Sequence, residues 1–399
     1  MKKYKVVIVG GGASGLACAV ELTRGKNALL GSDVLILERN DRLAKKLTVT
    51  GNGQGNITNA SLLACNFYGE KKFIDSFIEQ TKKYDVRKYF YGLGLATTVD
   101  KVGRVYPMSK QASAVSDVLR AHLSNKGVEV KLSSEVLEVN NTGDEFIIST
   151  SNGKYYSEKI VFAFGGSVAK QFGTDGSAYK LLLNFGHSVT KLYPSLVQIK
   201  TNLTKIRGLK GLKENAKITA FDGEKEIASA NGEILFTEYG ISGNAVFSIS
   251  GHLMKAKNPW VRVSFLPEVD DEMLVEILKN SNKNSPLYNE NAFAGIINKM
   301  IGKAVIKNAE SNSVYSLAYS AKNFDLSVTG SLGFNFAQVT KGGINTKDID
   351  PNTYQSKLVS DAYVIGEALD VDGDCGGYNL TFAWISGIVS ANVIKDQLK

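Results

Sequence analysis

The sequence is poor in cysteine and proline, and it contains no long apolar run. Its 399 residues include three cysteines, Cys18, Cys65 and Cys375, which are far apart and show no C-x-x-C or Cys/His spacing. This pattern argues against a disulfide framework and against a zinc site, so we expect no metal ion. Unpaired cysteines are typical of a reducing compartment, and we therefore expect a cytoplasmic protein.

No segment approaches the roughly 18 consecutive apolar residues that a membrane helix requires. The apolar run at residues 5–9 is followed at once by glycines, and Glu21 comes soon after, so we expect neither a signal peptide nor a membrane anchor. The composition, 43% hydrophobic and 22% charged, excludes a disordered or collagen-like chain. The length allows two or three domains.

The N-terminal segment carries the pattern of a dinucleotide-binding site. An apolar strand at residues 5–9 runs directly into Gly10-Gly11-Gly12-Ala13-Ser14-Gly15, and a helix-forming segment follows at residues 16–24. A second apolar strand at residues 33–37 then ends at Glu38. Strand, G-x-G-x-x-G, helix, strand and acid in this order predict a Rossmann-type site, although the motif alone does not separate FAD from NAD.

Each part of this pattern has a physical task. Gly10 makes the tight turn, Gly12 lets a pyrophosphate approach the backbone, and Gly15 lets the helix pack closely on the strand. The helix N-terminus presents free N–H groups to the phosphates, and Glu38 can accept hydrogen bonds from a ribose. The cofactor contacts expected in this segment are Gly10, Gly12, Ala13, Ser14, Gly15, Glu38 and Arg39.

A second strand-turn-helix pattern lies near the C-terminus. An apolar strand at residues 361–365 runs into Gly366-Glu367, further glycines follow, and an apolar helix extends from Thr381 to about Leu398. In flavoproteins with two such motifs, the second holds the ribityl chain, and its positive helix end faces the isoalloxazine ring. The run at residues 160–166 looks like a further strand and turn that lead toward FAD.

Together these segments resemble the HI0933-like (BaiN-like) family of FAD-dependent oxidoreductases, which have the glutathione-reductase-type flavoprotein fold. The similarity covers essentially the whole chain, and its most specific motif is G-E-A-L-D-V-D-G-D-C-G-G-Y-N. The segments that carry it are residues 46–59, 103–107, 235–243, 342–344 and 366–379.

The resemblance implies FAD as the cofactor, NAD(P)H as a transient electron donor, and reduction of an activated C=C bond in a small molecule. The further cofactor contacts that we expect are Lys46, Gly51, Asn52, Gly53, Asn56, Val136, Ala163, Gly165, Gly166, Gly366, Glu367, Asp370, Gly376, Gly377, Tyr378, Asn379 and Leu380.

Three residues are candidates for catalysis. Cys375 is either a redox or acid group or a small residue that fills a tight loop. Tyr378 either packs near the ring or donates a proton to the substrate, and Asn56 either contacts the flavin or shapes the loop under it.

The sequence departs from the family pattern at several positions. Gln54 and Gly55 stand where the family has Arg-Cys. The guanidinium of the family's arginine is therefore absent here, and the amide of Gln54 does not replace it at a bidentate site. Glu238 and Asn244 likewise replace the family's His and Pro.

The segment between the two motifs leaves the Rossmann pattern. Residues 194–266 alternate in a way that predicts antiparallel strands, in a barrel or a sandwich, and residues 270–322 show helical stripes. We therefore predict an α/β protein in which a discontinuous Rossmann-like FAD-binding domain contains an inserted antiparallel β domain with a small helical sub-domain. The predicted segments are 1–191 and 342–399 for the FAD-binding domain, 192–269 and 324–341 for the β insert, and 270–323 for the helical sub-insert.

No second G-x-G-x-x-G occurs in strand context, so a separate NAD(P)H domain is not expected. The formal net charge is +8, and residues 191–217 hold seven basic residues and one acid. That segment is either a solvated loop or a surface for an anionic partner, such as a phosphate group, an acidic substrate or RNA.

The sequence thus favours an FAD-dependent oxidoreductase that reduces an activated double bond. Two alternatives stay open: a flavin-dependent reductase of a uridine in structured RNA, and an amine oxidase-type or non-catalytic flavin-binding protein. The sequence specifies neither the substrate nor the oligomeric state.

Overall fold

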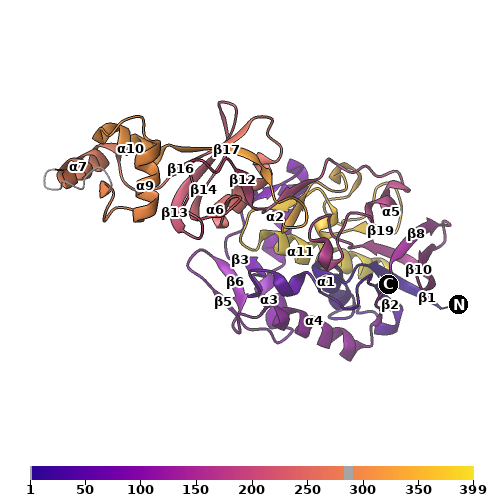
Figure 1. Cartoon of the computed structure of the whole chain (residues 1–399). Coiled ribbons are helices and arrows are strands. Elements are labelled where there is room, and N and C mark those ends of the chain that lie inside the picture. The colour runs from indigo at the N-terminus through magenta and orange to yellow at the C-terminus, as the bar shows by residue number, and fades with distance from the viewer. Residues whose placement is uncertain (1, 283–290) are drawn as a thin grey trace. The chain divides into compact units, whose positions relative to one another are not determined.

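The computed structural model describes residues 2–282 and 291–399 (Figure 1). Residues 283–290, which fall in the predicted helical sub-insert, lie outside the described residues. Within the described part, no helix combines the length and the apolar character needed to cross a bilayer.

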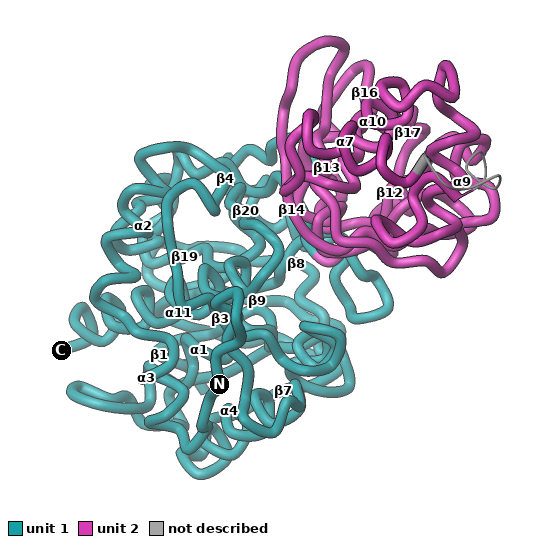
Figure 2. The backbone as a smooth tube through the Cα atoms, turned by 90° about the vertical axis from the view of Figure 1, so that its left-hand side faces the viewer, with its two compact units in different colours: residues 1–192, 339–399 teal, residues 193–338 magenta. Residues whose placement is uncertain are grey.

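The chain divides into two compact units (Figure 2). Unit 1 comprises residues 1–192 and 339–399, and unit 2 comprises residues 193–338. Unit 1 is therefore discontinuous in sequence, with unit 2 inserted in it. The boundaries drawn from the sequence pattern were 191/192 and 341/342.

Unit 1 is built around a parallel sheet in the order β7-β2-β1-β10-β19. Its central strands are continuous apolar runs, as expected for parallel strands that are buried on both faces. Strand β10 pairs with β1 along one side, and along its other side its first half pairs with antiparallel β9 and its second half with β19. The strands of this sheet are β1 (Lys3–Val9), β2 (Val34–Leu37), β7 (Glu129–Lys131), β8 (Val136–Asn141), β9 (Phe146–Thr150), β10 (Gly153–Phe162) and β19 (Ala362–Val364).

Helix α1 packs against both α4 and α11 in unit 1 (Figure 1). The contact with α11 is close, since a Cβ on Gly387 would lie 2.5 Å from the Ser14 carbonyl oxygen. Helix α11 begins three residues before the predicted start at Thr381. The helices of the unit are α1 (Ala13–Leu22), α2 (Lys71–Lys83), α3 (Val86–Tyr91), α4 (Ala112–Lys126), α5 (Tyr179–Leu183) and α11 (Tyr378–Gln397).

Two small antiparallel sheets complete unit 1, one in the order β3-β6-β5 and one formed by β4 and β20. They bring segments near residues 60, 105 and 373 together beside the start of α11. Their strands, with the short β18, are β3 (Thr58–Asn59), β4 (Phe67–Tyr68), β5 (Thr97–Val99), β6 (Arg104–Pro107), β18 (Val339–Lys341) and β20 (Asp372–Gly373).

Unit 2 contains a closed barrel in the order β12-β15-β14-β13-β16-β17. Helix α6, which the sequence pattern did not indicate, packs against β13 and β14. Among the described residues between β16 and β17 lie the helices α7, α9 and α10. The elements of the unit are β11 (Tyr193–Ser195), β12 (Ile199–Thr201), β13 (Lys213–Asp222), β14 (Lys225–Phe236), β15 (Gly240–Ser242), α6 (Asn244–Leu253), β16 (Pro259–Ser264), α7 (Asp271–Asn282), α9 (Lys299–Asn308), α10 (Val314–Lys322) and β17 (Phe324–Ser331).

Candidate dinucleotide-binding site

The glycine motif joins β1 to α1 at the carboxyl edge of the parallel sheet, where α/β proteins bind their ligands. Gly10 has a φ of +111°, and a Cβ there would overlap the Ala163 carbonyl, while one on Gly15 would overlap the Gly10 carbonyl. Gly12 differs, because no protein atom lies within 4 Å of the position that its Cβ would take. Two glycines therefore serve packing, and the third keeps the N-terminus of α1 accessible to a phosphate group.

The predicted ribose acid, Glu38, directly follows β2 and is buried. Its Oε2 accepts a hydrogen bond from the Gly11 N–H at 2.7 Å. Its Oε1 accepts two from Asn40, from the backbone N–H and from Nδ2, both at 2.8 Å. These bonds fix the carboxylate, and Oε2 keeps a lone pair that can accept a ribose hydroxyl.

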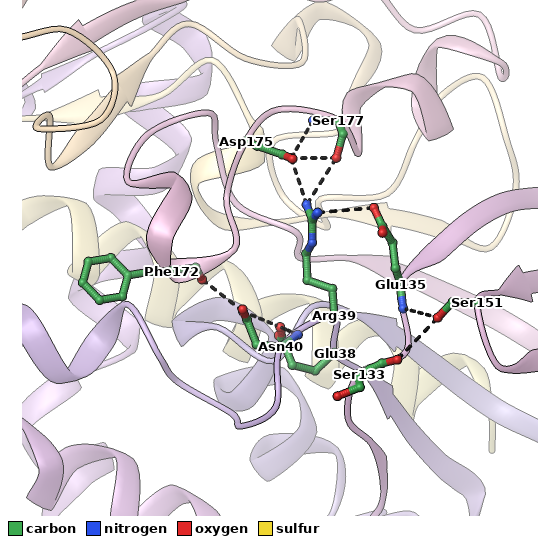
Figure 3. A network of polar contacts seen from close by, with 9 residues as sticks. All are labelled: Glu38, Arg39, Asn40, Ser133, Glu135, Ser151, Phe172, Asp175 and Ser177. Carbon is green, nitrogen blue, oxygen red and sulfur yellow. Dashed lines mark hydrogen bonds and ion pairs between the residues drawn. The ribbon is translucent and has the colours of Figure 1, made fainter.

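Arg39 lies between two loops at the end of β2 (Figure 3). Its Nη1 lies 2.8 Å from Asp175 Oδ1, and its Nη2 lies 3.4 Å from Glu135 Oε1. The Ser134 N–H donates to the Glu38 carbonyl at 2.8 Å, which places the segment that leads to Val136 beside the same strand end. The predicted residues Glu38, Arg39 and Val136 are therefore brought together.

Three other segments of the chain meet at Glu367. Lys46 Nζ lies 2.7 Å from its Oε2, and the Thr340 N–H donates to its Oε1 at 2.9 Å. A Cβ on Gly166 would lie 2.8 Å from the same Oε1. Three predicted residues thus meet here, together with Thr340, which sequence reasoning missed although it lies just before the G-G-I segment that resembles the family.

The ends of β10 and β19 lie close to the start of α1. Ala163 follows β10 and donates its N–H to the Val9 carbonyl at 2.8 Å, and Gly165 comes two residues later. Gly366 follows β19, and a Cβ on it would lie 2.5 Å from Ser14 Oγ. Asp370 is half-buried and donates its backbone N–H to the Ile344 carbonyl.

Gly377 is the N-cap of α11 and has a φ of +101°. A Cβ on this residue would overlap the Thr58 carbonyl. The carbonyl of Gly376 accepts from Asn59 Nδ2 at 3.1 Å. Asn379 accepts from the Gly373 N–H at 2.8 Å and returns a bond to the Gly373 carbonyl at 2.7 Å. The Asn379 amide therefore shapes the loop before α11, and the half-buried Leu380 lies in the first turn of that helix.

The loop at residues 51–53 is exposed and has left-handed backbone at Gly51, Asn52 and Gly53. Asn56 is buried, and its Nδ2 donates to the Thr58 and Val105 carbonyls at 3.0 and 3.1 Å. Both amide hydrogens are thus used inside the protein, which favours the loop-shaping interpretation of this residue.

Gly55 occupies the position of the family's cysteine. A Cβ there would lie 2.8 Å from the Ala112 Cα, in the first turn of α4. This departure from the family pattern has a steric reason in this chain, because a cysteine would push the loop away from α4. Gln54 beside it is exposed.

The environments of Cys375 and Tyr378 keep both groups protonated near neutral pH. Burial raises the pKa of the Cys375 thiol, Arg104 opposes this shift, and Asp374 adds to it. Burial also raises the pKa of the Tyr378 phenol, with further contributions from Asp374 and Cys65. A thiol that stays protonated is a poor nucleophile, whereas a protonated phenol can serve as a proton donor.

A buried ion pair joins β18 to β20, directly before the loop that leads to α11. Lys341 Nζ lies 3.0 Å from each carboxylate oxygen of Asp372, and both side chains are at most 6% exposed. The same ammonium lies 4.3 Å from the ring centroid of Tyr68, whose hydroxyl donates to Asp374 at 2.7 Å. These contacts position the loop that leads to Tyr378. In the described ranges, no three His, Cys, Asp or Glu side chains come together as metal ligands.

The residues fit FAD: Gly12 leaves a cradle at one helix N-terminus, Glu38 offers a buried ribose acceptor, and α11 provides a second helix N-terminus. Fold and site together define a dinucleotide-binding protein of the Rossmann type. The chain belongs to the HI0933-like family, because the family model described as HI0933-like protein Rossmann domain matches residues 4–393. The resemblance seen in the motifs is thereby confirmed.

Relatives with two different names match almost the whole chain. A 3-dehydro-bile acid delta(4,6)-reductase of Clostridium scindens is 30% identical and covers 98% of this chain and 99% of its own. A ribosomal RNA dihydrouridine synthase of Haemophilus influenzae is 26% identical and covers 98% of each. Among solved structures, a 3-ketosteroid delta1-dehydrogenase from Sterolibacterium denitrificans covers 100% of both chains at a TM-score of 0.54 and 12% identity, which shows a common fold.

Proposed function

We propose that this protein takes hydride from NAD(P)H onto FAD and reduces an activated C=C bond in a small molecule. The observation that carries the proposal is Tyr378, a protonated phenol in the first turn of α11, at the helix end expected to face the flavin. The similarity to a reductase that acts on a bile-acid skeleton supports this reaction class.

The bound FAD supplies the hydride chemistry, and the protein supplies binding, orientation and a proton. The N-terminus of α1 would bind the pyrophosphate through its free N–H groups, and Glu38 would hold the ribose. Tyr378 holds a proton at Oη. When hydride adds to one carbon of the double bond, this proton goes to the other, and solvent restores it.

The electron donor has no Rossmann domain of its own in the described part of residues 193–338, which forms a barrel and helices. NAD(P)H would therefore dock transiently and leave before the substrate binds. The three cysteines are free thiols, which supports a reducing, cytoplasmic setting.

A second candidate is the reduction of a uridine in structured RNA, and the basic segment at residues 191–217 favours it. Lys210 and Lys213 in this segment are paired with Glu238 and Glu233. Lys200, Arg207 and Lys217 are exposed, and the described residues provide no acid partner for them. These exposed cations can contact a phosphate backbone, and the similarity to a ribosomal RNA dihydrouridine synthase points the same way.

Stopped-flow absorbance of the flavin distinguishes the candidates. Anaerobic bleaching by NADH or NADPH, followed by reoxidation by an enone, is the expected result. Reoxidation by structured RNA instead, with binding that weakens steeply as salt rises, supports the second candidate. Bleaching by amines but not by NAD(P)H indicates an oxidase, and a purified protein that takes up no FAD refutes the assignment.

A further inference from the structure

Two loops from different parts of unit 1 meet at the end of β2. One follows β7 and contains Glu135, and the other follows β10 and contains Asp175. Between them lie Glu38, Arg39 and Asn40, which come from the strand end that binds the adenosine ribose in this fold (Figure 3).

Arg39 connects the two loops. Its Nη1 donates to Asp175 Oδ1 at 2.8 Å and to Ser177 Oγ at 3.3 Å, while its Nη2 forms the ion pair with Glu135 at 3.4 Å. Although partial burial opposes ionisation, hydrogen bonds from Ser177 and Arg39 lower the pKa of Asp175 to about 2, so the pair stays charged in ordinary buffers. Figure 3 shows the guanidinium pointing away from Glu38 and toward both acids.

The loop after β10 is also tied to the ribose acid. Asn40 Nδ2 donates to Glu38 Oε1 at 2.8 Å and to the Phe172 carbonyl at 3.0 Å. Gly173 has a φ of +90°, and a Cβ there would lie 2.8 Å from Asn40 Cγ, so only glycine allows this approach. Closer to β10, the same loop contains the buried Val168.

We propose that Arg39, Glu135 and Asp175 form a clasp across the adenosine end of the dinucleotide, and that opening of this clasp controls FAD release. The proposal rests on the proposed function, because it takes FAD as the ligand of this site. Glu135 and Asp175 are retention residues: they act through Arg39 and have no part in hydride transfer.

The chemistry of the clasp suits repeated opening. The three charged side chains are between 33% and 41% exposed, so their ion pairs are weak and sensitive to salt. Added salt would screen both pairs and weaken the attachment of the loop after β10 to the end of β2, where the hydrogen bond from Asn40 to the Phe172 carbonyl remains. FAD release is therefore predicted to become faster as the salt concentration rises.

The test measures FAD release from the holoprotein by the recovery of free flavin fluorescence, at low and at high salt. Asp175→Asn and the double variant Glu135→Gln/Asp175→Asn keep the side-chain shapes and remove the charges. We expect release at low salt to become about two- to fivefold faster for each lost pair, and the double variant to lose most of the salt response. Glu145→Gln is the matched control, because it breaks a similarly exposed ion pair with Lys3. Lys3 is the first residue of β1 and therefore lies at the end of the strand opposite the glycine motif.

Limited trypsin digestion gives a second readout that does not depend on activity. Lys170 is exposed within the loop after β10, and bound FAD should slow its cleavage in the wild type more than in the double variant. Wild-type release rates and salt response in the double variant would overturn the clasp. A wild-type protein that binds no FAD would instead overturn the proposed function.

Discussion

Replacing Gly12 with aspartate tests the dinucleotide site without disturbing the fold around it. Gly12 is the N-cap of α1, its φ of −82° is open to any residue, and no atom lies within 4 Å of its would-be Cβ. Aspartate is a better N-cap than glycine by a few tenths of a kcal/mol, and its charge favours the positive helix end. Without FAD, the variant should therefore unfold at the wild-type temperature or slightly above it.

The cost appears when FAD binds. A carboxylate at this position faces a pyrophosphate charge at about 4 Å, where two unit charges repel by about 4 kcal/mol at the effective dielectric constant of a protein surface. Since 1.36 kcal/mol corresponds to a factor of ten, the affinity for FAD should fall by about 10³. The purified Gly12→Asp protein is therefore expected to be colourless.

The assay compares the FAD content of purified proteins with an FAD titration of the apoproteins by fluorescence quenching. Gly12→Asn is the matched control, because it has the same shape and capping ability as aspartate but no charge. Its affinity should lie between those of wild type and Gly12→Asp. A folded Gly12→Asp protein with wild-type FAD content would show that no pyrophosphate lies at this helix end.

Three other variants test the remaining parts of the site and core. Tyr378→Phe should keep FAD and its reduction by NAD(P)H but slow reoxidation by an enone about 100-fold in stopped-flow experiments; an unchanged rate would exclude Tyr378 as the proton donor. Lys341→Met removes the cation that faces buried Asp372 and should lower the free energy of unfolding in urea by about 3–5 kcal/mol, with recovery in Lys341→Met/Asp372→Leu; a neutral single variant would contradict this role. Burial raises the pKa of the Cys18 thiol, so above about pH 8.5 the unfolded chain loses a proton that the folded chain keeps, and stability falls by about 1.4 kcal/mol per pH unit. Cys18→Ala should remove this part of the pH slope, and equal slopes in both proteins would refute it.

The local parts of the site could be predicted from the sequence. The strand before Gly10, the helix after Gly15 and the acid at Glu38 are short-range features, because each depends on residues within about one βαβ unit. The start of α11 was placed three residues too late, since the left-handed Gly377 lets the helix begin directly at Tyr378.

The long-range parts could not be predicted in the same way. Alternation between residues 194 and 266 indicates strands, but a barrel closes only through the pairing of β12 with β17, which no local pattern encodes. The clasp around Arg39 depends on acids that follow two other strands of the sheet, and nothing in their local sequence marks them as its partners. The hydrogen bond from Thr340 to Glu367 could not be predicted either, because it too depends on the topology of the fold and not on local sequence.

The close contact of α1 with α11 at Gly387 also sets the order in which the protein can mature. Helix α1 leaves the ribosome early, but α11, which packs against it, follows only after some 365 further residues. At typical synthesis rates this delay is on the order of 20 to 70 s, during which the apolar face of α1 lacks its cover. The cofactor site is therefore completed only once α11 has been synthesised, and a chaperone that shields the first βαβ unit should raise the yield of flavin-loaded protein.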